Sequence, residues 1–268
     1  MKFGNTAATM MIPDGATEPA ALKRVTHLGI GAHPDDLEFM ALHGILACYR
    51  KNDAWFGGVT CTNGGPTLIA ERHAEQEQAA RTGAYSFIAQ LGYTSTEAKD
   101  PHDDRLTRDL IALLSGCRPH TIYTHNPADK HDTHVVVLMR VVKALRSLPP
   151  DHRPQRLLGC EVWRDLDWML DSDKVRLDVS GHPDLAEKLA AAFVSQNARK
   201  RYDLAVRGRE RANATFFESH EPDGPTRVWH AMDLTPLLHD DHMSVSQLAN
   251  RHFAGFKNDV MERIERYA

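Results

Sequence analysis

The sequence lacks the features that mark a membrane span, a disulfide scaffold or a strongly basic nucleic-acid-binding surface. Its four cysteines lie far apart and form no CxxC pair, so we expect reduced and mostly buried thiols. No stretch approaches the roughly 20 apolar residues that a bilayer-spanning helix needs. With 36 acidic and 32 basic residues the net charge is −4, which argues against nucleic acid as a partner.

Internal repeats, low-complexity segments and a Pro/Gly-rich linker are also missing. With 268 residues, 42% of them hydrophobic, the chain is long enough to bury a substantial core. We therefore expect one domain over residues 1–268. The N-terminal segment MKFGNTAATMMIPDG is a poor signal peptide, because it has one lysine and no long apolar core. We expect a cytoplasmic protein without a membrane partner.

Short apolar runs alternate with longer helical patterns through the first half of the chain, and the second half is less regular. Alternating strands and helices predict an α/β fold with a mostly parallel sheet covered on both faces. The predicted strands are 25–32, 54–61, 120–126, 156–163 and 175–180. The predicted helices are 36–50, 67–90, 104–116, 132–148, 183–196, 198–214 and 245–267.

Polar segments follow three of the predicted strands. HPDD (33–36) follows the first strand, TNGG (62–65) follows the second, and HNPADKHDTH (125–134) follows a later one. In parallel α/β sheets the site forms at the carboxyl ends of the strands. We therefore expect these three loops to meet at one edge of the sheet.

The HPDD segment has two interpretations. In the simpler one it caps a helix, because proline fits the first helical turn and Asp35 and Asp36 are favoured by the helix dipole. That interpretation does not explain His33, nor a second histidine pair, His131 and His134, three residues apart at the start of another predicted helix.

The alternative is a metal site. His33, Asp36 and His134 supply two imidazoles and one carboxylate, a familiar set for catalytic zinc with a position left open for water and substrate. The same set can hold iron(II), so the ligands alone do not decide the metal. Asp35 then remains free to take a proton from water, and His131 to donate a hydrogen bond to an oxyanion. These are the parts needed to hydrolyse an amide.

The motifs and their order resemble the LmbE/PIG-L superfamily of zinc-dependent de-N-acetylases. AHPDD (32–36) and HDTH (131–134) resemble the two metal-binding motifs of that family, and RHAE (72–75) and LAEKLAAAFVSQ (185–196) resemble two of its helices. The resemblance covers roughly residues 25–196. It implies a Rossmann-like three-layer α/β/α sandwich with a core of 24–196 and a C-terminal extension of 197–268.

The resemblance also implies roles for individual residues. His33, Asp36 and His134 stand at the positions of the family's zinc ligands, and Asp35 at that of its base. His131 stands at the position of the oxyanion partner, and Arg72 at that of a substrate or active-site contact. Two positions depart from the family pattern: Thr133 replaces an acid that moves to 132, and Glu38 is displaced within the continuation of HPDD.

Other residues near the motifs have a plain and a functional interpretation. Asn63 is either a turn residue or a substrate contact, and Asp129 and Lys130 either solvate the loop or touch substrate. The basic stretch 199–215 is a solvated helix face, a patch for an anionic substrate such as a sugar phosphate, or an oligomer contact. Three tryptophans serve in core packing or as stacking surfaces for a sugar: Trp163, Trp168 and Trp229.

We therefore expect a zinc-dependent hydrolase that removes an acetyl or related acyl group from an N-acyl amino sugar or glycoside-like small molecule. The alternatives are another metal-dependent amidase, including an iron(II) protein, and a non-catalytic, metal-stabilised sugar-binding module. A free Asp35 beside the metal argues against the binding module, which has no need of a base. Because several members of the family assemble into oligomers, the resemblance also implies a homo-oligomer.

Overall fold

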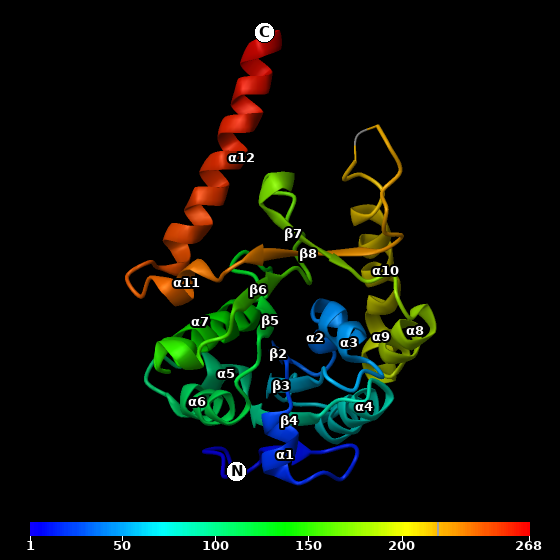
Figure 1. The fold of residues 1–268 in the computed structure, drawn as a ribbon, viewed down its shortest axis with the longest axis vertical. Coiled ribbons are helices and arrows are strands. Elements are labelled where there is room, and N and C mark those ends of the chain that lie inside the picture. Colours follow the sequence, from blue (N-terminus) through cyan, green and yellow to red (C-terminus); the bar gives the residue numbers. More distant parts are fainter. Residues whose placement is uncertain (219) are drawn as a thin grey trace.

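A mixed eight-stranded sheet runs through the molecule in the computed structural model, which describes residues 1–218 and 220–268 (Figure 1). The strand order is β1-β4-β3-β2-β5-β6-β8-β7. The strands are β1 (Thr9–Met11), β2 (His27–Gly31), β3 (Phe56–Thr62), β4 (Phe87–Tyr93), β5 (Thr121–His125), β6 (Arg156–Cys160), β7 (Lys174–Asp178) and β8 (Val228–Asp233).

The five central strands, β4-β3-β2-β5-β6, are parallel, whereas β1 pairs antiparallel with β4 and β8 pairs antiparallel with β6 and β7. Every residue of β3 and of β5 is buried, as expected for parallel strands that are covered on both faces. The predicted α/β fold with a mostly parallel sheet is confirmed.

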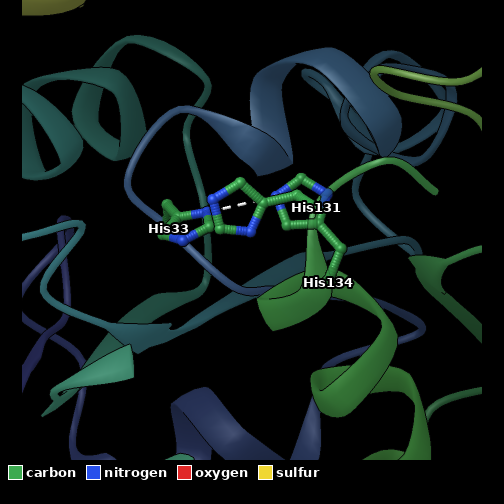
Figure 2. Close-up of side chains that lie close together, drawn as sticks. All are labelled: His33, His131 and His134. Carbon is green, nitrogen blue, oxygen red and sulfur yellow. Dashed lines mark hydrogen bonds between the residues drawn. The ribbon is translucent and has the colours of Figure 1, made fainter. Parts of the chain in front are cut away.

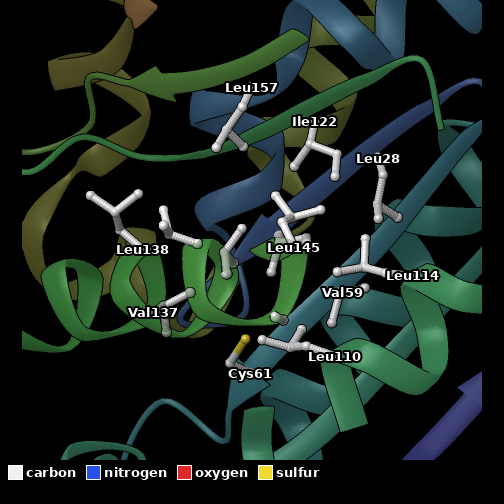
Figure 3. Close-up of a cluster of buried hydrophobic side chains, with 14 of the residues drawn as sticks. Leu28, Val59, Cys61, Leu110, Leu114, Ile122, Val137, Leu138, Leu145 and Leu157 are labelled. Atoms are coloured by element: carbon white, nitrogen blue, oxygen red, sulfur yellow. The ribbon is translucent and has the colours of Figure 1, made fainter. Parts of the chain in front are cut away.

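Helices cover both faces of this sheet, each over its own apolar core. One core lies under α1 (Glu18–Lys23), α5 (Ser95–Lys99), α6 (Arg105–Cys117), α7 (Asp132–Arg146) and α11 (Pro236–His239), and part of it is drawn in Figure 3. The other lies under α2 (Asp36–Met40), α3 (Leu42–Cys48), α4 (Ile69–Thr82), α8 (Pro183–Ala191), α9 (Val194–Lys200) and α10 (Tyr202–Asn213). The result is the expected three-layer α/β/α sandwich.

Two short 3-10 turns, η1 (Pro150–His152) and η2 (Asp171–Asp173), connect elements of the second half. The C-terminal helix α12 (Val245–Tyr267) has the predicted bounds, and a capping box of Ser244 and Gln247 begins it. Val245 and Leu248 in its first turns are buried, Phe253 further along packs on Trp168, and the C-terminal end projects away from the body of the molecule (Figure 1). Among the described helices, none has both the length and the apolar character needed to cross a membrane.

The helix predicted over 67–90 is wrong in its last third. α4 ends at Thr82, and the next residues, Gly83 and Ala84 with its positive φ of 52°, turn the chain into β4. The segment that follows alternates little and is apolar, which is the pattern of a fully buried strand. The helix predicted over 36–50 is likewise divided at Ala41 into α2 and α3.

Close contact between β2 and α2 positions the first polar loop. A Cβ atom at Gly31 would lie 2.9 Å from the Cβ of Asp36, and one at Gly29 would lie 3.0 Å from the side chain of Leu37. Only glycine therefore lets α2 approach the strand this closely. The consequence is that Asp36 begins its helix directly above the carboxyl end of β2.

Glu161, just after β6, ties the C-terminal half to the sheet. Its buried Oε1 accepts hydrogen bonds from the Asn213 side chain at the end of α10 and from the His230 N–H in β8. Asn213 also donates to the carbonyl of Val228 at 3.1 Å. These bonds hold α10, which begins at Tyr202, against β8.

Burial raises the pKa of Glu161 from 4.5 to about 7, with the nearby Arg209 opposing the shift. The folded state therefore keeps a proton that the unfolded chain releases near pH 4.5, so stability should fall as pH rises from about 4.5 to 7. In the native protein this loss should amount to a free energy of unfolding of order 1–3 kcal/mol, and we expect Glu161→Gln to remove it. Urea unfolding of both proteins at pH 5 and pH 8 measures it, and parallel pH profiles would contradict the expectation.

Candidate active site

The three predicted polar loops meet at the carboxyl edge of the sheet. The Thr62 N–H donates to the carbonyl of Ala32 at 2.7 Å, which joins the loop after β3 to the loop after β2. The Ala32 N–H donates to His125 Nε2 at 2.9 Å, which joins β2 to β5. Figure 2 shows the outcome: His33 of the first loop lies against His131 and His134 at the start of α7.

The three expected metal ligands converge from two loops. His33 Nδ1 lies 3.1 Å from His134 Nε2 and 3.3 Å from Asp36 Oδ2, and His134 Nε2 lies 3.4 Å from Asp36 Oδ1. Tetrahedral zinc with bonds of about 2.0–2.1 Å separates its donors by about 3.3–3.4 Å. Among the described residues, the buried Asp36 Oδ1 has no hydrogen-bond donor. His33 lies near one oxygen of Asp36 and His134 near the other, and His33, His131 and His134 also form a candidate metal group. The donor types and the unpaired oxygen fit a divalent cation.

Charge also favours a cation at this point. Burial opposes ionisation of Asp36, but His134, His125 and His33 around it hold the pKa of its carboxyl well below the usual range. The carboxylate is therefore present as an anion at neutral pH. Its Oδ2 accepts the His33 N–H at 2.7 Å, which closes the turn and leaves Oδ1 directed toward His134.

His125 belongs to the surroundings of the site. Its Nε2 lies 3.4 Å from Asp36 Oδ2, close enough to form a second candidate metal group with Asp36 and His134. However, Nε2 accepts the Ala32 N–H, so its lone pair is already used. Burial lowers the pKa of His125 to about 4, which keeps the ring neutral. We therefore assign His125 to holding the Ala32 backbone and prefer His33 as the ligand.

Asp129 orients His134. Its Oδ1 lies 3.3 Å from His134 Nδ1, so it can hold the proton there and leave Nε2 free for a metal. The same carboxylate accepts the His131 N–H at 3.0 Å and the Trp163 N–H at 3.2 Å. Asp129 is 8% exposed. These contacts favour a positioning role for Asp129 over the substrate contact expected from the sequence.

Asp35 lies beside the proposed ligands and lines a cavity of about 210 Å³. Its φ of 97° is in the left-handed region, which costs a non-glycine residue of order 1–3 kcal/mol. Its N–H donates to Gln76 Oε1, and Gln76 Nε2 donates to Glu38 Oε1 at 2.8 Å. Burial, together with the charge of Asp36, raises the pKa of Asp35 well above its usual value. A carboxylate with a raised pKa is suited to take up a proton.

Glu38, the displaced acid of the sequence pattern, lies behind this base. Its Oε1 accepts the hydroxyl of the buried Tyr85 at 2.6 Å as well as the Gln76 amide. Burial raises the pKa of Glu38 to about 7. The displaced acid thus holds Gln76, which in turn holds the backbone of Asp35.

His131 is the N-cap of α7. Its Nδ1 accepts the Thr133 N–H at 3.2 Å, so the proton of the neutral ring lies on Nε2. Burial, and next the neighbouring His33, lower the pKa of His131, which favours that neutral form. The Thr133 backbone amide therefore orients the His131 ring. In the family pattern an acid at position 133 can do this, but here the acid is at Asp132. The Nε2–H is then available to a substrate oxygen.

The other predicted contacts divide into two groups. Arg72 lines the same cavity as Asp35, and its guanidinium donates to the carbonyl of Gly64. Asn63 instead accepts the Gly65 N–H at 3.2 Å and lines a neighbouring cavity, and Lys130 is exposed in the loop before α7. A substrate contact by Asn63 or Lys130 stays a prediction.

Residues from the second half complete the cavity wall. Trp163, Gln196 and Tyr202 line it, and the rings of Trp163 and Tyr202 lie 4.5 Å apart. Trp168 packs on Phe253 and Trp229 is buried in the core, so among the three tryptophans considered Trp163 is the one beside the site. No spacing in the sequence marks Tyr202, because it lies beyond the segment that carries motifs.

Comparison with known proteins identifies the family. The PIG-L family, described as GlcNAc-PI de-N-acetylase, matches residues 28–145, which include all three candidate ligands. The uncharacterized deacetylase YaiS of Escherichia coli (strain K12) is 30% identical over 155 residues, covering 56% of this chain and 80% of YaiS. The chain belongs to the PIG-L family.

This PIG-L protein shares its fold with solved structures of proteins whose activities differ from one another. The N,N'-diacetylchitobiose deacetylase of Pyrococcus horikoshii matches with a TM-score of 0.61 and 17% identity, covering 85% of this chain and 90% of its own. The 4-carboxy-2-hydroxymuconate hydratase GalB of Pseudomonas putida KT2440 matches with a TM-score of 0.58 and 15% identity, covering 78% and 96%. The fold alone therefore does not choose the reaction.

Proposed function

We propose that this PIG-L protein is a zinc-dependent N-deacetylase that hydrolyses the acetamido group of an N-acetylated amino sugar or related glycoside. The observation that carries the proposal is the convergence of His33, Asp36 and His134 at donor spacings that suit zinc, with Asp35 free beside them. Family membership supports the reaction type, since YaiS and the chitobiose enzyme are both named deacetylases.

His33, Asp36 and His134 would hold the zinc ion, which would supply Lewis-acid polarisation of the acyl carbonyl and make water more acidic. The residues of the chain perform the remaining tasks. Asp35 accepts the proton of the attacking water and returns it to the departing amine. His131 donates its Nε2–H to the carbonyl oxygen as negative charge develops there.

The cavity wall supports a sugar as the substrate. Trp163 and Tyr202 present two aromatic rings beside the site, and Gln196 adds an amide. Aromatic rings with polar groups beside them suit a sugar, which has apolar faces and polar edges. Ser195 donates to Glu75 through its N–H at 2.7 Å and its hydroxyl at 2.6 Å, which anchors α9 over the cavity.

The proposal is tested by a mass-spectrometric screen for the loss of one acetyl group across N-acetylated sugars, including N-acetylglucosamine and N,N'-diacetylchitobiose. The zinc-loaded protein should convert at least one of them to the free amine, and the chelated protein none. A protein that binds such sugars without converting any would favour the binding module. Elemental analysis of protein purified without added metal distinguishes zinc from iron(II).

A cytoplasmic location is also proposed. The four cysteines are free and buried, as suits a reducing compartment. In the basic stretch 199–215, Arg201, Arg207 and Arg209 each form an ion pair with an acid. The absence of a nucleic-acid partner stays a prediction.

The expected homo-oligomer has a candidate surface in α12. Met261, Ile264 and Tyr267 on its projecting part are 44%, 56% and 83% exposed, and acidic and basic residues alternate between them. An exposed helix end gains little stability from its own hydrogen bonds in water, so a second copy of the chain, with the same apolar and mixed-charge face, is the proposed neighbour of this end.

Met261→Glu with Ile264→Glu should shift the protein from oligomer to monomer, because charge is placed on the face that would be buried. Light scattering after size-exclusion chromatography measures the mass. Asn258→Glu, an exposed change on the same helix, should leave the mass unchanged. An unchanged mass in the double variant would exclude α12 as the interface.

A further inference from the structure

A second cavity adjoins the candidate active site. It has a volume of about 250 Å³ and shares four lining residues with the first cavity: Gly64, Arg72, Gln196 and Tyr202. A substrate whose acetamido group lies at His33 and Asp35 therefore has room to extend past Arg72. What fills this adjoining cavity decides which amino sugar the site prefers.

The charge of the lining changes between the two cavities. Asp35 and Asp36 line the first, together with the histidines. Arg72 and Lys200 line the second, and no carboxylate among the described residues does so. Two cations in a confined space without an acidic neighbour in the wall form a site for an anion.

Arg72 is held in place by the turn after β3. Its guanidinium donates to the carbonyl of Gly64. Gly64 also has a φ of +73°, which favours glycine. Among the described residues, the buried Nε of Arg72 has no acceptor. The turn therefore holds a guanidinium whose Nε–H is an unused hydrogen-bond donor.

Lys200 differs from three arginines of the basic stretch, Arg201, Arg207 and Arg209. Arg201 pairs with Asp203 at 3.0 Å, Arg207 with Glu187 at 2.8 Å and Arg209 with Asp165 at 3.3 Å. Among the side chains that the structure describes, Lys200 forms no ion pair, and it lines the cavity. It is the last residue of α9, whose first turn is anchored to Glu75 by Ser195.

We propose that Arg72 and Lys200 form a subsite for a phosphate group, so that the preferred substrate is a phosphorylated N-acetyl amino sugar. A guanidinium offers a planar fork that matches phosphate oxygens, and an ammonium adds a compact charge. The hydroxyl of Thr67 and the amide of Gln196 line the same cavity and can complete the donor set. The inference rests on the proposed deacetylase function and extends it to the substrate class.

The test compares kcat/KM for N-acetylglucosamine with that for its 1-phosphate and its 6-phosphate. One phosphate ester should be preferred at least tenfold, mainly through a lower KM, and the preference should shrink as salt increases. Lys200→Gln should reduce the ratio of kcat/KM for phosphorylated to neutral sugar by about tenfold, the loss of one charge-assisted contact. Lys257→Gln, an exposed lysine on α12, is the matched control and should keep the ratio.

Deacetylation of the neutral sugar with no preference for either phosphate would overturn the subsite and leave the proposed function standing. If no sugar is deacetylated, the proposed function fails, and calorimetric titration of zinc-free protein with the two sugar phosphates decides the subsite by itself. Binding that weakens about tenfold in Lys200→Gln supports it. Equal binding by both proteins, or no binding, overturns it.

Discussion

Asp35→Asn should lower kcat by on the order of 10²–10⁴-fold while zinc content stays at the native level. The change keeps the shape of the side chain but removes the group that accepts the proton. Because the N–H of residue 35 still donates to Gln76, the left-handed backbone should be retained. Single-turnover rates and metal analysis of the same preparation measure both quantities.

Asp132→Asn is the matched control for this variant. It makes the same chemical change at an exposed acid that is also close in sequence to the proposed ligands, but His131 is held by the Thr133 amide. We expect its kcat within about twofold of the native value, as for a surface acid outside the reaction. Full activity in Asp35→Asn, or an equal loss in both variants, would contradict the role of Asp35 as the base.

His134→Ala should lose zinc affinity by well over the 10–100-fold that an outer hydrogen-bond partner of a ligand typically contributes. The change removes one of three protein ligands and leaves Asp36 buried with less positive charge around it. Zinc titration against a competing chelator measures the affinity. The native protein should also lose thermal stability on chelation, whereas His134→Ala should not, since ligand binding to the folded state is the source of that stabilisation.

Asp129→Asn provides the intermediate case. It keeps the side chain in place behind His134 but removes the charge that favours a proton on Nδ1. The expected loss of zinc affinity is about 10–100-fold, smaller than that of His134→Ala. Stoichiometric zinc of native affinity in His134→Ala would rule out that ligand. A loss of activity in Asp129→Asn without a loss of affinity would instead favour the substrate contact first expected for Asp129.

Local residue patterns were sufficient to predict the architecture around the site. HPDD, TNGG and HDTH each stand after a short apolar run that ends abruptly, which predicts a strand followed by a polar loop. Parallel topology then places these loops at one edge of the sheet. The structure brings His33, Asp36 and His134 together as that reasoning expects. Their role as zinc ligands stays a proposal, because proximity of donor atoms is not binding.

Features that depend on tertiary contacts were not predictable in the same way. No proline separates the alanine-rich helix α4 from β4. The change from helix to strand is therefore marked by little more than Gly83 and the positive φ of Ala84. The role of Asp129 depends on tertiary contacts, because its carboxylate accepts the Trp163 N–H and lies beside His134 Nδ1. Tyr202 reaches the cavity from a helix that no motif marks.

Two of the antiparallel strands show the same limit. β1 at one edge of the sheet and β8 beside β6 flank the parallel strands, and neither was predicted. Their stability comes from the strands that they join and from packing, so a local pattern carries little of the signal. The projecting helix α12 was predicted with its bounds, because a capping box and a helical apolar spacing are both local features.

The most direct test of the proposal is acetate release from N-acetylated amino sugars by one preparation in three states: zinc-loaded, chelated, and reloaded with zinc. We predict release of acetate and free amine in equal amounts by the loaded protein, none after chelation, and recovery on reloading. Acetate release that persists unchanged after complete removal of the metal would contradict the metal-dependent mechanism. Absence of release by the zinc-loaded protein across the whole panel would contradict the deacetylase assignment itself.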